Sequence, residues 1–150
     1  MIRIQREDFD TGAEIAKLTA GNPKVGGLAI FVGLVRDMAE GEAVRAMTLE
    51  HYPGMTEKKL AEIEAEARRR WPLEATLVIH RYGELKPGDK IVLVAAASSH
   101  RDAAFEACRF LIDWLKTKAP FWKLEETPAG PRWVEAKSSD DQAADRWVAE

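Results

Sequence analysis

The chain has 150 residues, 46% of them apolar, and a formal net charge of −3, which suits one globular domain with its own core. This charge argues against a general nucleic-acid binder, and the sequence has neither an apolar signal segment nor a run long enough to span a membrane. The single cysteine, Cys108, excludes an internal disulfide and fits a reducing compartment. We therefore expect one soluble, cytoplasmic domain over residues 1–150.

Short elements follow one another in the first third of the chain. Residues 11–14 (TGAE) have capping-box spacing and predict a short helix that ends near Gly21. The glycine-bounded, β-prone run 26–37 (GGLAIFVGLVRD) predicts a buried strand. Residues 38–46 are expected to form a mobile loop, and a second strand is expected within residues 44–52.

The middle of the chain shows one helix and one hairpin. Apolar residues recur at helical spacing over residues 56–71, which predicts an amphipathic surface helix. Two strand-like runs, 75–83 and 90–98, flank the Pro-Gly signal of residues 84–89 and predict a hairpin.

The last third should begin with the longest helix, over residues 98–119, with Ser99 and Asp102 at capping spacing. Strand-like segments follow within residues 121–136, and the polar end, about residues 138–150, is expected to be partly disordered. Interleaved helices and hairpins favour an α+β fold with a mostly antiparallel or mixed sheet.

On a helical wheel, the apolar residues of the long helix cover well over half of its circumference. The helix should therefore be central or meet a partner chain. Lys116 falls on the remaining polar strip, where a surface pair with Asp113 is the plain alternative to a functional role. Cys108 lies within the apolar arc without any sign of an activated thiol, so we exclude it as a nucleophile.

Three basic residues are candidate anion ligands. His100 and Arg101 fall at the expected N-terminus of the long helix, where free N–H groups and the helix dipole favour phosphate or carboxylate. An exposed polar turn explains them equally well. Arg36, at the end of the strand within residues 26–37, is a further candidate.

Lys123 follows two aromatic residues, and in an extended segment it shares a face with Phe121. Loss of hydration against an aromatic ring would lower the lysine pKa and suit the side chain to proton transfer. An edge-strand lysine that discourages aggregation is the alternative.

Metal and other nucleophilic chemistries find little support. The three histidines, His51, His80 and His100, are scattered and give no metal-ligand spacing with the one cysteine. No Walker loop and no G-x-S-x-G elbow is present. The residues alone therefore predict a basic anion site on an α+β domain, without a metal.

Several segments together resemble the catalytic (large) subunit family of molybdopterin synthase. They are FVGLVRD, LEHYPGMTEKKL, HRYGELKPGD, SSHRDAAFEACRFLIDWLK, APFWKLEE and RWVEA, in the order of the family and between residues 25 and 137. The resemblance implies an α+β fold containing an α/β-hammerhead. It also implies an enzyme of molybdenum-cofactor biosynthesis that adds two sulfurs to cyclic pyranopterin monophosphate (precursor Z), giving molybdopterin.

The same resemblance implies the partners. Sulfur arrives as a thiocarboxylate on the C-terminal Gly-Gly of a small ubiquitin-like carrier subunit, within a heterotetramer built on a homodimer of large subunits. No cofactor is expected. The alternative is a non-catalytic module that binds a phosphorylated small molecule or only a ubiquitin-like tail. An RNA-binding domain is disfavoured by the acidic composition.

Transferred position by position, the two active-site lysines of the family fall on Lys116 and Lys123. The substrate-binding positions fall on Leu34, Val35, Arg36, His100, Arg101, Leu124 and Glu125. Some members have an arginine where this chain has Lys137, so its role stays open. Lys116 is expected to move a proton or stabilise an oxyanion, with Lys123 in support and Phe121 and Trp122 forming a wall that excludes water.

His100 and Lys116 are sixteen positions apart on one expected helix, about 24 Å at ~1.5 Å per residue. One small substrate could hardly touch both on the same chain. We therefore predict a site built across a dimer interface, with His100 and Arg101 of one protomer facing Lys116 and Lys123 of the other.

Overall fold

The computed structural model describes residues 1–39, 42–134 and 138–148. The strands are β1 (Ile2–Gln5), β2 (Gly27–Leu34), β3 (Met38–Ala39), β4 (Glu42–Ala43), β5 (Ala46–His51), β6 (Leu73–Arg81), β7 (Gly83–Leu85), β8 (Lys90–Ser98), β9 (Phe121–Thr127) and β10 (Gly130–Val134). The helices are α1 (Thr11–Thr19), α2 (Met55–Arg70), α3 (Arg101–Lys118) and α4 (Ser138–Asp145). The predicted α+β class is confirmed.

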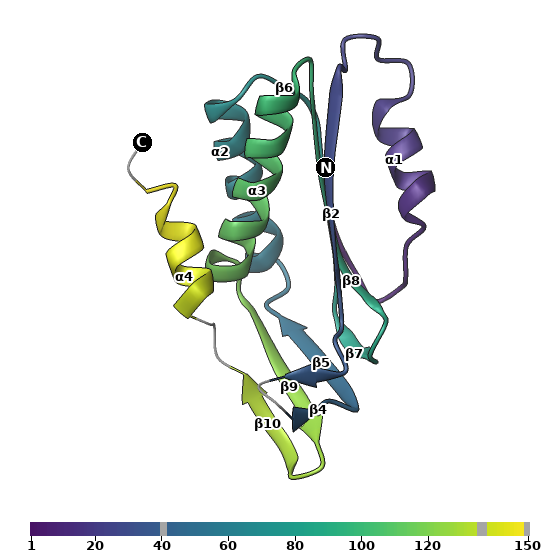
Figure 1. The fold of residues 1–150 in the computed structure, drawn as a ribbon, viewed down its shortest axis with the longest axis vertical. Helices are drawn as coiled ribbons and strands as arrows, with labels where there is room; N and C mark the ends of the chain where they lie inside the picture. The colour runs from purple at the N-terminus through teal and green to yellow at the C-terminus, as the bar shows by residue number, and fades with distance from the viewer. Residues whose placement is uncertain (40–41, 135–137, 149–150) are drawn as a thin grey trace.

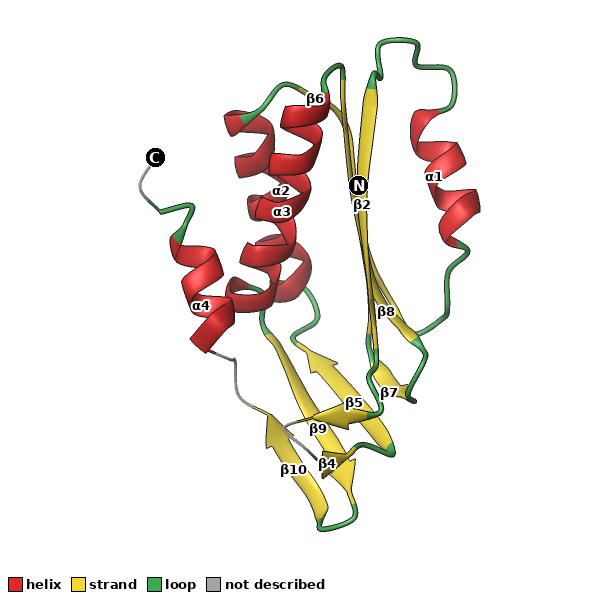
Figure 2. Ribbon diagram, in the orientation of Figure 1, coloured by secondary structure: helices red, strands yellow, loops and turns green. Residues whose placement is uncertain are grey.

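Two four-stranded sheets organise the molecule (Figures 1 and 2). The first has the order β1-β6-β8-β2, in which β1 pairs with β6 in parallel and the other pairs are antiparallel. The second, β10-β9-β5-β7, is antiparallel throughout. The expected hairpin of β6 and β8 is present, and the expected mostly antiparallel, mixed pairing is confirmed.

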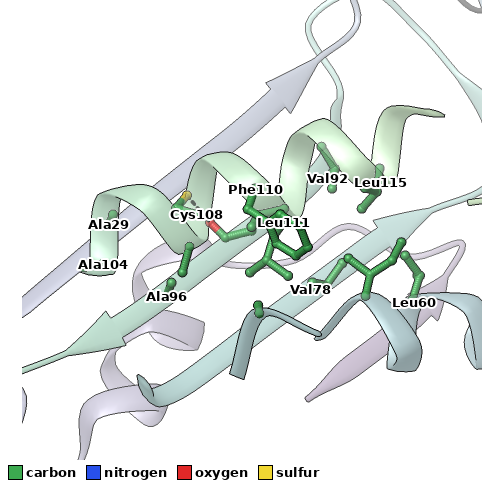
Figure 3. Packing of buried hydrophobic residues seen from close by; sticks show 14 of the residues in the cluster. Ala29, Leu60, Val78, Val92, Ala96, Ala104, Cys108, Phe110, Leu111 and Leu115 are labelled. Carbon is green, nitrogen blue, oxygen red and sulfur yellow. Dashed lines mark hydrogen bonds between the residues drawn. The ribbon is translucent and has the colours of Figure 1, made fainter. Parts of the chain in front are cut away.

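The main core fills the space between the first sheet and the helices α2 and α3, while α1 covers the opposite face (Figure 1). Residues 92–97 of the central strand β8 are fully buried because helices lie on both of its faces. From α3, Ala104, Cys108, Phe110 and Leu111 reach this sheet (Figure 3). The central position of the helix thus explains most of its wide apolar arc, while Phe105 within that arc is 63% exposed.

Both helix starts differ in detail from the predicted caps. Asp10, not Thr11, caps α1, and its Oδ1 accepts a hydrogen bond from the Ala13 N–H at 3.0 Å. His100, not Ser99, is the N-cap residue of α3, and its side chain makes no capping hydrogen bond. Capping spacing in the sequence located each helix, and at α1 the neighbouring residue Asp10 supplies the cap.

The described part of the C-terminal segment contains a helix that its polar composition did not predict, while the disorder expected within residues 138–150 stays a prediction. Residues 138–145 form α4, and the Trp147 that follows is only 8% exposed. Its indole Nε1 donates to Asp113 Oδ2 at 2.8 Å, and its ring meets Trp71 and Phe110 edge-on. Composition missed this because one buried tryptophan is enough to anchor a polar helix against α3.

In the segment 38–46, β3 and β4 pair through Met38 with Ala43, and residues 40–41 lie outside the described residues. The mobility expected there stays a prediction. Lys137 also lies outside the described ranges. Across the described part of the chain, none of the helices is long and apolar enough to cross a membrane.

Candidate active site

Lys116 and Lys123 lie on either side of a fixed corner. Lys116 occupies the last turn of α3, Lys123 lies within β9, and Ala119 and Pro120 join the two elements. Pro120 cannot continue the helix because it has no N–H to donate. The Phe121 N–H donates to the Ala119 carbonyl at 2.8 Å, and Thr56 Oγ1 donates to the Pro120 carbonyl at 3.4 Å. The sequence therefore holds both lysines at one rigid turn.

Strand β9 presents alternate residues to opposite faces of the second sheet. Phe121 is the cross-strand neighbour of His51, and Lys123 is that of Leu49, so Phe121 and Lys123 share one face as predicted. Trp122 lies on the other face, where its ring meets Tyr52 at 4.7 Å. The expected common wall of Phe121 and Trp122 is therefore wrong, because adjacent strand residues point in opposite directions.

A buried histidine underlies this corner. The His80 imidazole stacks on Phe121 with ring centroids 3.8 Å apart and planes inclined by 16°. His80 Nδ1 lies 2.8 Å from the Arg81 carbonyl, so this nitrogen donates and Nε2 keeps its lone pair. Burial lowers the pKa of His80 to about 3; the Arg81 carbonyl opposes this shift, and the charges of Lys116 and His51 add to it.

The segment 34–36 lies at the same end of the molecule as Lys116 and Lys123. Val35 is 6% exposed and belongs to a small core with Met47, Leu49 and Leu85, and Leu49 is the strand neighbour of Lys123. Leu34 and Arg36 on either side of it are exposed. The Arg36 guanidinium is therefore available to an anion, whereas the side chain of Val35 is committed to the core.

Leu124 and Glu125 follow Lys123 and differ from each other. Leu124 is half-buried on the Trp122 face of the sheet, beside Trp133 of β10. Glu125 is 5% exposed and pairs with Arg132 at 3.4 Å, on the face of Lys123. A carboxylate that is already paired is better suited to holding β9 and β10 together than to binding an anionic ligand.

His100 and Arg101 lie at the opposite end of α3 from Lys116. A Cβ on Gly27 would lie 3.3 Å from the Arg101 Cα, so β2 begins beside the start of α3. Both elements then run toward the corner, where β2 ends just before Arg36 and α3 ends after Lys116 (Figure 1). The structure thus brings Arg36 to the same end of the fold as the two lysines, and leaves His100 and Arg101 at the other end.

Two signals were missed at the sequence level. His80 follows the apolar run LVI of β6, and a polar residue at a buried strand position is a sign of a specific partner. Arg132 could have been paired with Glu125 only from the β9–β10 register. No spacing rule connects Phe121 with His80, because the two rings meet through the tertiary fold.

The geometry defines an α+β protein with a lysine corner at one end of its central helix and exposed basic side chains at both ends. Its one thiol, Cys108, is buried, and burial raises the pKa of this group to about 11. Residues 4–118 match the family model described as MoaE protein. The chain belongs to the MoaE family.

Similar proteins carry a functional name. The molybdopterin synthase catalytic subunit of Ralstonia nicotianae is 58% identical over 97% of this chain and 83% of its own length. That of Pseudomonas aeruginosa is 56% identical over 97% of both chains. The solved MoaE protein of Burkholderia ambifaria MC40-6 superposes with a TM-score of 0.85 at 58% identity, covering 100% of this chain and 99% of its own.

Proposed function

We propose that this chain is the catalytic subunit of a molybdopterin synthase and adds two sulfur atoms to cyclic pyranopterin monophosphate, giving molybdopterin. The observation that carries the proposal is the identity of 58% and 56% to two catalytic subunits of that name over 97% of the chain. The lysine corner and the exposed Arg36 support it, because a phosphate substrate and a carboxyl-type donor both require cationic partners.

The sulfur donor in this proposal is the C-terminal thiocarboxylate of a small ubiquitin-like carrier subunit. Each transfer breaks the bond between the carbonyl carbon of the carrier and its sulfur, and forms a carbon–sulfur bond on the pterin in place of a carbon–oxygen bond, whose oxygen stays on the phosphate or leaves as water. The carrier then leaves as a carboxylate whose new oxygen comes from water. One thiocarboxylate holds one sulfur, so each molybdopterin consumes two carriers.

Lys116 is the residue to which we assign the chemistry. Its exposed position on the last turn of α3 lets its ammonium group donate a proton or stabilise the oxyanion that forms at the carbonyl of the carrier. Lys123 supports it and holds the pterin or its phosphate, on the face it shares with Phe121. The remaining substrate contacts that we propose are Leu34, Val35, Arg36, Leu124 and Glu125, with the buried members acting through their backbone groups.

The second half of the site, His100 and Arg101, would come from a partner protomer in a homodimer within a heterotetramer. This follows from the length of α3, because Lys116 lies fifteen positions after Arg101, about 22 Å at ~1.5 Å per residue. A complex in which His100, Arg101, Lys116 and Lys123 of one chain touch the same substrate would refute this arrangement. We place the reaction in the cytoplasm, which suits a chain whose one cysteine is free and buried.

The test is an anaerobic mass-spectrometric assay for the dithiolene product, with this protein, pyranopterin monophosphate and a thiocarboxylated carrier. We expect product from the wild type and a loss of about 10²–10⁴-fold in Lys116→Ala. Lys118→Ala is the matched control, because Lys118 lies in the same turn, where its Nζ covers the Trp114 ring at 5.0 Å. Equal product from Lys116→Ala would remove Lys116 from the chemistry. No product from the wild type, with carrier binding intact, would favour the non-catalytic binding module.

A further inference from the structure

The corner between α3 and β9 rests on aromatic rings. Phe121 lies flat on His80, and the ring of His51, its cross-strand neighbour, is 6.2 Å away. The His51 ring in turn lies 4.6 Å from the Tyr82 ring. The rings of His80, Phe121, His51 and Tyr82 therefore form a continuous row beneath the corner. Since Phe121 is the first residue of β9, the position of its ring sets the direction in which the strand leaves the corner.

Histidine is an unusual residue at a buried position whose only requirement is an apolar side chain that fills the space. His80 is 3% exposed and continues the side of β6 on which Val78 faces the main core. Burying an imidazole costs desolvation energy that leucine would avoid, and the Arg81 carbonyl accepts a hydrogen bond from only one of its two nitrogens. A specific use of the ring would account for its presence.

The charge state of the ring fits such a use. The low pKa of His80 keeps the imidazole neutral at physiological pH, and the charge of Lys116 is among its causes, so the two side chains are within electrostatic range. A neutral ring gives the corner a flat surface and adds no positive charge that would repel the ammonium groups.

We propose that His80 is a positioning residue for the two lysines: its ring fixes Phe121, and Phe121 fixes how Lys116 and Lys123 face one another. The inference rests on the proposed function and adds to it a residue that need touch neither substrate nor carrier. If His80 only filled the core, any apolar side chain of similar size would serve equally well.

The test compares two substitutions in the synthase assay. His80→Leu keeps the site filled but removes the flat ring, and we expect kcat to fall at least about tenfold, with KM for the carrier unchanged, because small misplacements of catalytic groups cost this much or more. His80→Phe keeps a ring against Phe121, and we expect it to restore kcat to within about threefold of the wild type. Phe121→Leu removes the same stack from the other side and should match His80→Leu.

Ile79→Ala is the matched control, because Ile79 is the fully buried neighbour of His80 and packs on the opposite, α1 side of the sheet. A fall in kcat equal to that of His80→Leu would show that lost stability alone explains the effect. The proposal would also be overturned if His80→Leu kept kcat near the wild-type value, or if His80→Phe were no better than His80→Leu. Should His80→Leu fail to fold, Phe121→Leu and His80→Phe decide the question.

A second readout does not depend on activity. The ¹³Cε resonances of Lys116 and Lys123, assigned with Lys→Arg variants, should shift in His80→Leu and stay in place in Ile79→Ala. Unchanged lysine resonances in His80→Leu would refute the positioning role. If the wild type made no product, the proposed function would fail, while these resonances would still decide whether His80 positions the lysines.

Discussion

The two sheets of this protein differ in how completely their faces are buried. Strand β8 of the first sheet lies between helices on both faces, and its residues 92–97 are fully buried. The second sheet buries one face in a small core, while its other face leaves Trp133 60% and Tyr52 54% exposed. The candidate catalytic lysines lie where the chain leaves helix α3, which packs on the first sheet, and enters strand β9 of the second sheet. The comparison shows a sheet covered on both faces, with the candidate catalytic lysines at its edge.

The largest expected effect concerns the two ends of α3. Arg101→Ala and Lys116→Ala should each be nearly inactive as homodimers. A heterodimer of one chain of each, isolated with two different affinity tags, should recover about half of the wild-type activity, because a two-fold dimer then contains one intact site. The sulfur-transfer assay measures this recovery directly.

A heterodimer as inactive as its parents would mean that each site is built from a single chain. A wild-type heterodimer carrying the same two tags controls for the effect of the tags. Size-exclusion chromatography with light scattering should first show that both variants still form dimers.

The next largest effect tests the scaffold. Phe110 is fully buried among Trp71, Trp114 and Trp147, with ring centroids 4.5–5.7 Å away. Phe110→Ala should lower the free energy of unfolding by about 3–5 kcal/mol, since the cavity cannot close around three rigid rings. Urea titration followed by tryptophan fluorescence measures it. A loss of less than about 1 kcal/mol would mean that this part of the core is not well packed.

The third expected effect is a loss of folding stability at low pH. Below pH 6.5 an unfolded chain protonates His80, while the folded chain keeps it neutral down to a pKa of about 3. The unfolded state therefore binds more protons in this window, and stability falls as the pH is lowered from 6.5. This group contributes at most about 1.4 kcal/mol per pH unit.

Urea titrations between pH 6.5 and 5 would measure this slope, and His80→Phe should flatten it. Equal slopes for both proteins would show that the buried imidazole does not control the acid response.

The smallest effect completes the comparison of the sheets. Trp133→Ala removes a large ring from the open face of the second sheet, and the free energy of unfolding of the isolated chain should change by less than about 0.5 kcal/mol. The same urea titration applies. A loss close to that of Phe110→Ala would show that this face is covered in solution and would erase the distinction between the sheets.

Periodicity predicted the elements that bury one regular face. The helix α2, the hairpin of β6 and β8 and the long helix α3 were all expected within a few residues of their bounds. Strand β1 was missed because its alternation of apolar and polar side chains runs over only four residues, and the strand forms by pairing with β6. Helix α4 was missed because its anchor, Trp147, finds its partners only in the folded protein.

The candidate site could be predicted only in part from the sequence. The helical wheel placed Lys116 on a polar strip and strand alternation put Phe121 and Lys123 on one face, and the structure agrees with both. The assignment of these lysines to catalysis came from the resemblance to a family, because no local pattern marks a lysine as reactive. The stacking of His80 on Phe121 joins residues 41 positions apart, so it could be recognised only in the folded structure.

Strand β2 has a practical consequence for handling the protein. It is an end strand of the first sheet, so in the described part of the chain one of its edges offers unpaired backbone N–H and C=O groups. Ile30, Phe31 and Leu34 on this strand are 48%, 40% and 51% exposed. An isolated chain is therefore prone to form larger aggregates at high concentration. A charged substitution at Ile30 should therefore raise the solubility of the isolated chain.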